Sequence, residues 1–167
     1  QRVKPSQFGR TYYEGTSVQN VNKDLRRAML GNCWEYDIRS SVVAWKMGWA
    51  KQCIQSRGQG EELRKVFSAT INFLEDKAGF MGTVQYFTFD EVSPVPKDLQ
   101  PKLLKQAFTA ISFGARQNTT GWQNESGGWT NPALVDIIKN GDDRRRFLAD
   151  ASVQAFIKEQ AMLDAYL

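Results

Sequence analysis

Apolar and polar residues form the clearest pattern of the chain between Cys33 and Ile54. Trp34 to Ile38 alternates large apolar with polar side chains, as a short half-buried strand does, and from Ser40 onward apolar residues recur at helical spacing. They form one stripe of Val43, Met47, Ala50 and Ile54 and a second stripe of Val42, Trp45, Trp49 and Cys53. Because the stripes cover more than half of the circumference, the pattern predicts a helix that is largely buried.

Asp37 stands where this strand passes into the helix. A carboxylate at that point is a hard oxygen ligand for a divalent metal, and the unpaired N–H groups of a helix start favour an anion. A metal ion and a phosphate can therefore meet at Asp37. The alternative is that Asp37 only caps the helix, for which Ser40 and Ser41 are further candidates.

The rest of the pattern is mostly helical. Apolar spacing and capping residues predict helices at 22–30, 61–77, 101–116, 131–140 and 144–167. A second strand is predicted at 83–89, which is rich in β-branched and aromatic residues, with Gly79 ending the helix before it. The sequence therefore predicts an α+β protein that is mainly helical with a small β-sheet.

Composition is that of one soluble globular domain, with 41% of the 167 residues hydrophobic and 24% charged. No apolar run approaches the roughly 18 residues of a membrane span, so we expect no membrane partner. The absence of histidine and of a Cys-x-x-Cys pair excludes zinc sites and Ser-His-Asp or Cys-His catalysis. The two cysteines are expected to act as small apolar residues in a reducing compartment, which indicates the cytoplasm, or the virion and host cytoplasm for a viral protein.

Charge is placed unevenly. Residues 1–31 hold six Lys and Arg against two acids, and residues 97–116 hold four against one, while the whole chain carries only +4. Concentrated basic surface suggests phosphate or nucleic acid as the partner, although a solvated charged face is the alternative.

The helix at 101–116 carries part of this charge on one face. At 100° per residue, Leu104, Ala107, Phe108 and Ile111 lie on one side. The opposite side holds Lys102, Lys105, Thr109, Ser112, Phe113 and Arg116. Three cations beside one aromatic ring suit a triphosphate and a base stacked on the ring.

Three other segments contain side chains that could bind a ligand, and for each segment a purely structural or solvent-exposed role is the alternative. Residues 1–19 mix basic, aromatic and amide groups, which suits nucleic acid or an ordinary loop. The polar loop 117–132 carries Trp122 and Trp129, which either contact a ligand or pin the loop to the core. Asp90 and Glu91 follow the second predicted strand, where they bind a metal or simply end the strand in solvent.

Several of these pieces occur in one order along the chain. Gly9-Arg10 is followed by Gln19-Asn20, by Leu25-Arg26-Arg27-Ala28-Met29, by the strand that ends at Asp37, and by the basic helix that ends in Ser112-Phe113-Gly114. This order resembles the palm and fingers of the family A DNA polymerases and of their single-subunit RNA polymerase relatives, over roughly residues 9–45 and 100–116.

The resemblance implies a role for each matching residue. Asp37 would be the catalytic residue and the first ligand of Mg²⁺ or Mn²⁺. The primer–template would be bound by Arg10, Gln19, Asn20, Arg26 and Arg27. The nucleoside triphosphate would be bound by Lys102, Lys105, Thr109, Phe113 and Arg116.

The sequence departs from the family at three points. Thr109 stands where the family has its fingers lysine, so the phosphate contact of that lysine is either lost or taken by Lys102 or Lys105. Val42 replaces the glutamate with which the DNA polymerases exclude ribonucleotides, so the choice between DNA and RNA stays open. Two-metal chemistry also needs a second carboxylate, and no matching hairpin follows Arg116. Gly141-Asp142-Asp143 looks like a turn motif of RNA-dependent polymerases, but we interpret it as a helix start.

The missing carboxylate and the start at Gln1 both suggest a portion of a longer or multi-chain protein. We expect residues 1–167 to form one domain, palm-like over 1–96 and fingers-like over 97–167, with another polypeptide completing the site. The leading hypothesis is a template-dependent nucleotidyltransferase. The alternatives are a non-catalytic nucleic-acid-binding accessory module and a small metal-dependent nuclease or effector domain that uses Asp37, Asp90 and Glu91.

Overall fold

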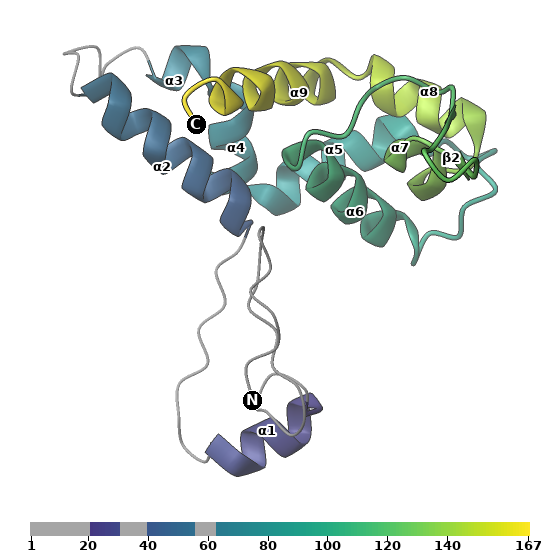
Figure 1. Cartoon of the computed structure of the whole chain (residues 1–167), viewed down its shortest axis with the longest axis horizontal. Helices are drawn as coiled ribbons and strands as arrows, with labels where there is room; N and C mark the ends of the chain where they lie inside the picture. The colour runs from purple at the N-terminus through teal and green to yellow at the C-terminus, as the bar shows by residue number, and fades with distance from the viewer. Residues whose placement is uncertain (1–20, 31–39, 56–62) are drawn as a thin grey trace. The chain divides into compact units, whose positions relative to one another are not determined.

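The computed structural model describes residues 21–30, 40–55 and 63–167 of the chain. The chain divides into two compact units, residues 1–37 and residues 38–167. The first unit contains α1, which runs from Lys23 to Leu30 as predicted (Figure 1). Asn22 caps it, because its Oδ1 accepts the N–H of Leu25 at 2.8 Å. Leu25 and Met29, two large apolar residues of this helix, are exposed.

The second unit is built almost entirely of helices (Figure 1). They are α2 (Ser41–Gln55), α3 (Leu63–Val66), α4 (Ser68–Glu75), α5 (Lys77–Thr88), α6 (Gln100–Ser112), α7 (Ala133–Ile137), α8 (Gly141–Ala149) and α9 (Ala151–Asp164). The strands β1 (Trp122–Gln123) and β2 (Trp129–Thr130) pair antiparallel. The expectation of a mainly helical fold with a small sheet is therefore confirmed. Helix α9 packs on α4 and α2, and α5 packs between α6, α8 and α4.

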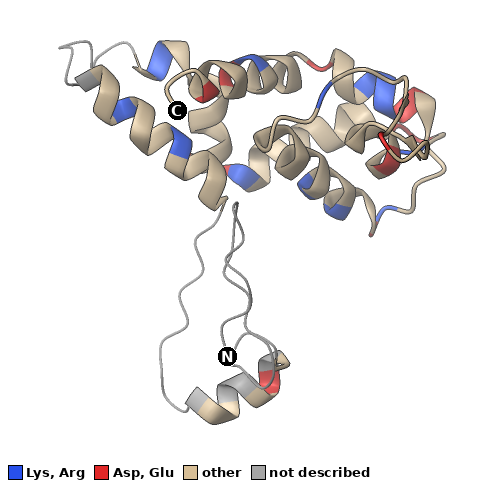
Figure 2. Cartoon of the chain, viewed as in Figure 1, with Lys and Arg blue, Asp and Glu red and all other residues tan. Residues whose placement is uncertain are grey.

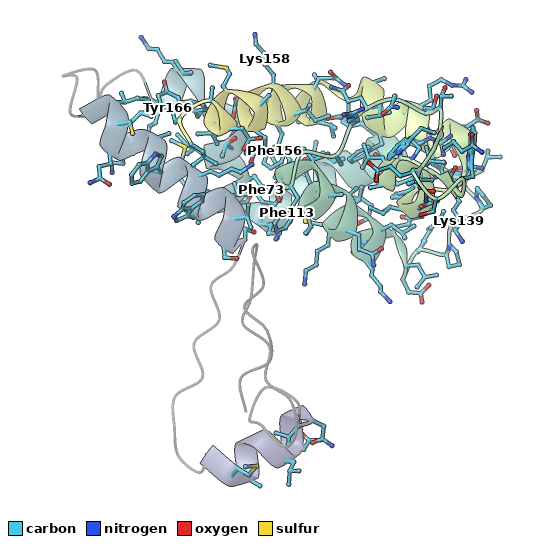
Figure 3. The ribbon with its side chains drawn as sticks, in the orientation of Figure 1. Phe73, Phe113, Lys139, Phe156, Lys158 and Tyr166 are labelled. Carbon is cyan, nitrogen blue, oxygen red and sulfur yellow. The ribbon has the colours of Figure 1, made fainter. Side chains whose placement is uncertain are left out.

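A cluster of phenylalanine rings in tilted and edge-to-face contact forms the centre of this unit. The ring centroids of Phe73 and Phe156 lie 4.9 Å apart, and Phe156 meets Phe108 edge to face at 5.3 Å (Figure 3). Phe80 and Phe147 extend the cluster on either side. These rings come from α4, α5, α6, α8 and α9. Contacts of Phe108 with the other rings therefore fix the position of α6 in this unit.

Residues 77–88 form a helix, so the strand predicted at 83–89 was wrong. Asp76 caps the start of α5, since its Oδ1 accepts the N–H of Gly79 at 2.9 Å. Gly79 therefore lies in the first turn of this helix and does not end the one before. Val84 and Thr88, one turn apart, are buried, while Tyr86 and Phe87 are exposed. Packing of one helical face has thus overridden the strand preference of β-branched and aromatic residues.

Two long predicted helices are each broken. The helix expected at 61–77 is interrupted at Phe67, whose φ of −118° and ψ of 40° separate α3 from α4. The helix expected at 144–167 is interrupted at Asp150, which has a ψ of 130° and caps α9 by accepting the N–H groups of Ser152 and Val153. Asn140 caps α8 in the same way, so Asp142 and Asp143 do lie at a helix start as interpreted.

Helix α2 is less buried than its two apolar stripes predicted. The stripe that contains Val43 and Ala50 is in the core, whereas Trp45 and Trp49 of the second stripe are exposed. Trp49 donates its Nε1–H to the backbone oxygen of Tyr166 at 2.8 Å. Only one face of α2 therefore meets α4 and α9, and the indole rings lie at its edge.

Candidate nucleic-acid interface

Several sequence candidates lie outside the described residues. Asp37, the expected metal ligand, is one of them, together with the expected primer–template contacts Arg10, Gln19 and Asn20. Arg26 and Arg27 belong to α1, but their side chains are not described. Within 21–30, 40–55 and 63–167, no group of three His, Cys, Asp or Glu side chains is arranged to hold a metal.

Helix α6 brings the expected nucleotide-binding residues together on one exposed side. Its apolar face is buried as predicted, with Leu104, Ala107, Phe108 and Ile111 in the core. The outer side exposes Lys102, Lys105 and Thr109, and Phe113 follows at the helix end with 72% of its surface exposed. Figure 2 shows the lysines of α6 in blue and no red Asp or Glu on its ribbon. The sequence of α6 contains no acid, so the only charges on its outer face are the positive ones of Lys102 and Lys105.

Ser112 does not share this outer face, contrary to the helical projection. It is buried, and its Oγ–H donates to the backbone oxygen of Thr109 at 2.7 Å. Thr109 in turn donates its own Oγ1–H to the oxygen of Lys105 at 2.7 Å, which leaves its hydroxyl oxygen as an acceptor toward solvent. The exposed set is thus Lys102, Lys105, Thr109, Phe113 and Arg116, which we call the α6 surface.

The end of α6 is held by a Schellman motif. Gly114 has a φ of +83°, the N–H of Ala115 donates to the oxygen of Ala110, and the N–H of Gly114 donates to that of Ile111, both at 2.9 Å. A left-handed residue is needed here, and glycine takes that conformation without strain. The chain therefore turns sharply directly after Phe113, leaving that ring exposed beyond the core (Figure 3).

Lys46 supports this helix end from inside the unit. It lies on the buried face of α2 with 5% of its surface exposed, and its Nζ donates to the backbone oxygen of Ser112 at 2.6 Å. Asp164 of α9 forms an ion pair with the same ammonium group. A helix leaves its last carbonyl groups without partners, and Lys46 satisfies one of them. Its position on the Val43–Ala50 stripe was the sequence signal that it is buried, but its partner was not predictable.

The loop after α6 returns as a short hairpin. Trp122 pairs with Thr130, and Gln123 pairs with Trp129. Cross-strand partners share a face and successive residues alternate, so the two tryptophans lie on opposite faces of this ribbon. Both indoles are exposed, so they do not pin the loop to the core.

A pocket lies between this hairpin and the end of α6. It has a volume of about 360 Å³ and is lined by Gly114, Ala115, Arg116, Trp122, Pro132 and Ala133. We call it the Trp122 pocket. Its lining brings together one guanidinium, one indole and a floor of small residues, which suits a flat ring that carries negative charge.

Asp90, the first of the two acids after α5, forms an ion pair with an arginine. Asp90 Oδ2 lies 2.9 Å from Nη1 of Arg146, and Arg146 also contacts the buried Asp143 at 2.5 Å and the backbone oxygen of Thr88 at 2.9 Å. Glu91 is exposed beside this cluster. The ion pair of Asp90 with Arg146 therefore holds the connection between α5 and α6 onto α8.

Comparison with protein-family models, with curated proteins and with solved structures finds no significant match to this chain. No helix in the described parts of the chain is long and apolar enough to cross a membrane.

Proposed function

We propose that this chain binds nucleic acid through the α6 surface. The observation that carries the proposal is the acid-free outer face of α6, on which Lys102 and Lys105 precede a Phe113 ring that is 72% exposed. Lysine and arginine neutralise phosphates, and an exposed ring provides a stacking platform for any base.

The dimensions of the surface suit several nucleotides. Lys102 and Phe113 are separated by about 16 Å along the helix axis at roughly 1.5 Å per residue. This is the length of about five nucleotides at roughly 3.4 Å each in a stacked strand. A strand that lies along α6 would therefore meet the lysines with its phosphates before a base reaches Phe113.

A charge-reversal experiment tests this proposal. The variant with Lys102→Glu and Lys105→Glu is compared with a control in which Lys51→Glu and Lys158→Glu make the same change in net charge on α2 and α9. Lys51 is exposed, and Lys158 points outward from α9 (Figure 3). The measurement is fluorescence anisotropy of a labelled oligonucleotide as a function of salt.

We expect the α6 variant to lose about tenfold or more in affinity and to lower the salt slope by about 1.4, at roughly 0.7 per phosphate contact on a single strand. The control variant should keep the wild-type slope. Equal losses in the two variants would mean that only net charge attracts the oligonucleotide, and the α6 surface would be refuted as the interface.

Template-dependent nucleotide transfer is the second candidate. The resemblance to family A polymerases predicted a basic helix that ends in an aromatic residue and a glycine, and the exposed cations, Phe113 and the Gly114 turn of α6 support it. In that reaction Asp37 would hold Mg²⁺ or Mn²⁺, which would activate the attacking hydroxyl. Among the described residues, no group of three His, Cys, Asp or Glu side chains is arranged to hold that metal.

Primer extension separates the two candidates. Wild type and Asp37→Asn are tested for extension of a labelled primer–template with Mg²⁺ or Mn²⁺, alone and with any polypeptide that co-purifies. Extension that Asp37→Asn abolishes, with oligonucleotide binding intact, would support catalysis. Binding without extension in every case would leave the non-catalytic module, and shortening of the labelled strand would favour the nuclease alternative.

A further inference from the structure

We infer that the Trp122 pocket receives one unpaired nucleobase, with the neighbouring phosphate on Arg116, so that the chain prefers single-stranded over duplex nucleic acid. This inference rests on the proposed function and names the kind of nucleic acid that the α6 surface takes. The inference depends chiefly on Trp122, which lies outside α6 and has no part in the charge pattern of that helix.

The pocket has the size and the surfaces that a base requires. Its volume of about 360 Å³ falls at the lower end of the roughly 300–1,000 Å³ typical of small-ligand sites. Gly114, Ala115 and Ala133 have little or no side chain, which leaves room for a flat ring to lie over the backbone. The indole of Trp122 offers the stacking surface beside that ring.

The hairpin register assigns the pocket to one tryptophan and keeps the other away from it. Trp122 lines the pocket, whereas Trp129 lies on the opposite face and donates its Nε1–H to Oδ1 of Asn131 at 3.1 Å. The Trp129 ring also passes so close to Gly121 that a Cβ atom there would lie 2.6 Å from its Nε1. Trp129 thus makes its contacts outside the pocket, and as a second exposed tryptophan of the same hairpin it is the matched control for Trp122.

The pocket is continuous with the α6 surface. Phe113 is followed at once by Gly114 and Ala115, which line the pocket, and Arg116 belongs to both. A strand that follows the lysines of α6 therefore reaches Phe113 first and the pocket next. A paired base cannot enter, because it would first have to leave its stack and its partner, at a cost of a few kcal/mol.

Another pocket of the same volume does not fit this role. It is lined by Asn72, Glu75, Asp76, Phe80, Thr83 and Ser152. Two carboxylates would repel a phosphate, and no cation lines it. The guanidinium of Arg116 is what distinguishes the Trp122 pocket as a site for a nucleotide unit.

The test compares three ligands of the same length: a single strand, the same strand with abasic sites throughout, and the duplex. All keep their phosphates, so the α6 surface binds each, but only the first presents unpaired bases. We expect wild type to bind the single strand about tenfold more tightly than the abasic strand. Trp122→Leu should remove most of this difference, Trp122→Phe should restore much of it, and Trp129→Leu should retain it.

The outcomes separate this inference from the proposed function. If no ligand binds in a salt-dependent way, the proposed function fails and the pocket fails with it. If all three ligands bind wild type equally, the phosphate contacts of Lys102 and Lys105 stand, and both the base pocket and stacking on Phe113 are overturned. If Trp122→Leu and Trp129→Leu behave alike, the α6 surface stands and the base pocket is overturned. If a free mononucleotide at micromolar concentration displaced the strand, the pocket would be a site for a free nucleotide, and its assignment to a base within a strand would be overturned. Circular dichroism checks that each variant is folded.

Discussion

Glu159 offers the sharpest test of how this fold is held together. It belongs to α9, is only 5% exposed, and reaches the start of α4, where its two carboxylate oxygens accept the N–H of Ala69 at 3.0 Å and that of Thr70 at 2.6 Å. Phe67, which precedes α4, provides no side-chain cap. The first N–H groups of α4 therefore depend on a carboxylate 90 residues away in sequence.

Glu159→Gln changes this contact with almost no change in volume. The amide keeps one oxygen but places an NH₂ donor where the second oxygen was, so one buried N–H loses its acceptor. An unsatisfied buried donor costs about 1–3 kcal/mol. Loss of a negative charge at a helix N-terminus costs about 0.5–1 kcal/mol more. We expect the free energy of unfolding to fall by about 2–3 kcal/mol, a large part of the roughly 5–15 kcal/mol typical of a domain.

Glu75→Gln is the matched control. Glu75 bonds Arg64 at 2.8 Å, but the two side chains are 56% and 75% exposed, and such pairs contribute roughly 0–1 kcal/mol. In thermal unfolding followed by circular dichroism, we expect Glu159→Gln to lower the midpoint by about 4–12 °C, at roughly 2–4 °C per kcal/mol. The control should move it by less than about 4 °C on the same scale. Equal shifts in the two variants would refute the view that Glu159 is the cap of α4.

Three further changes test the support of the candidate interface. Gly114→Ala should lower stability by about 1–2 kcal/mol, because alanine is strained at a φ of +83° while its Cβ meets no neighbour; an unchanged thermal midpoint would contradict this. Lys46→Met should lower the free energy of unfolding, measured in urea, by about 1–3 kcal/mol, since the buried oxygen of Ser112 loses its donor. A more stable variant would show that the cost of burying the ammonium group exceeds the stabilisation from this hydrogen bond. Gly121→Ala should disorder the hairpin, because the new Cβ would lie 2.6 Å from Nε1 of Trp129. The near-ultraviolet circular dichroism of the indoles should then be lost. An unaltered spectrum would mean that the hairpin accommodates the methyl group.

The helices and the faces of α6 were predictable because both follow from local spacing. Residues three and four apart share a face whatever surrounds them, so Leu104 and Phe108 were assigned to the core and Lys102 and Lys105 to solvent. The exposed position of Phe113 followed from the same projection. The projection failed at Ser112, next to the turn at which regular geometry ends.

The strand predicted at 83–89 shows the limit of local preference. Val84 and Thr88 favour a strand by type, yet they lie one turn apart and both pack into the core as members of a helix. The cap at Asp76 and the contacts of α5 with α6 and α8 decide the outcome. No pattern within the segment itself contains that information.

The sequence by itself determined that the chain is mainly helical, which side of α6 faces the core, and that the other side is basic and aromatic. Those features depend on neighbours within two turns of a helix, which any single segment contains. Only the tertiary structure decided that Glu159 caps α4, that Lys46 holds the end of α6, and that Trp122 and Arg116 line one pocket. These are contacts between segments far apart in sequence, and a buried polar group takes whichever partner the packed core brings within hydrogen-bonding distance.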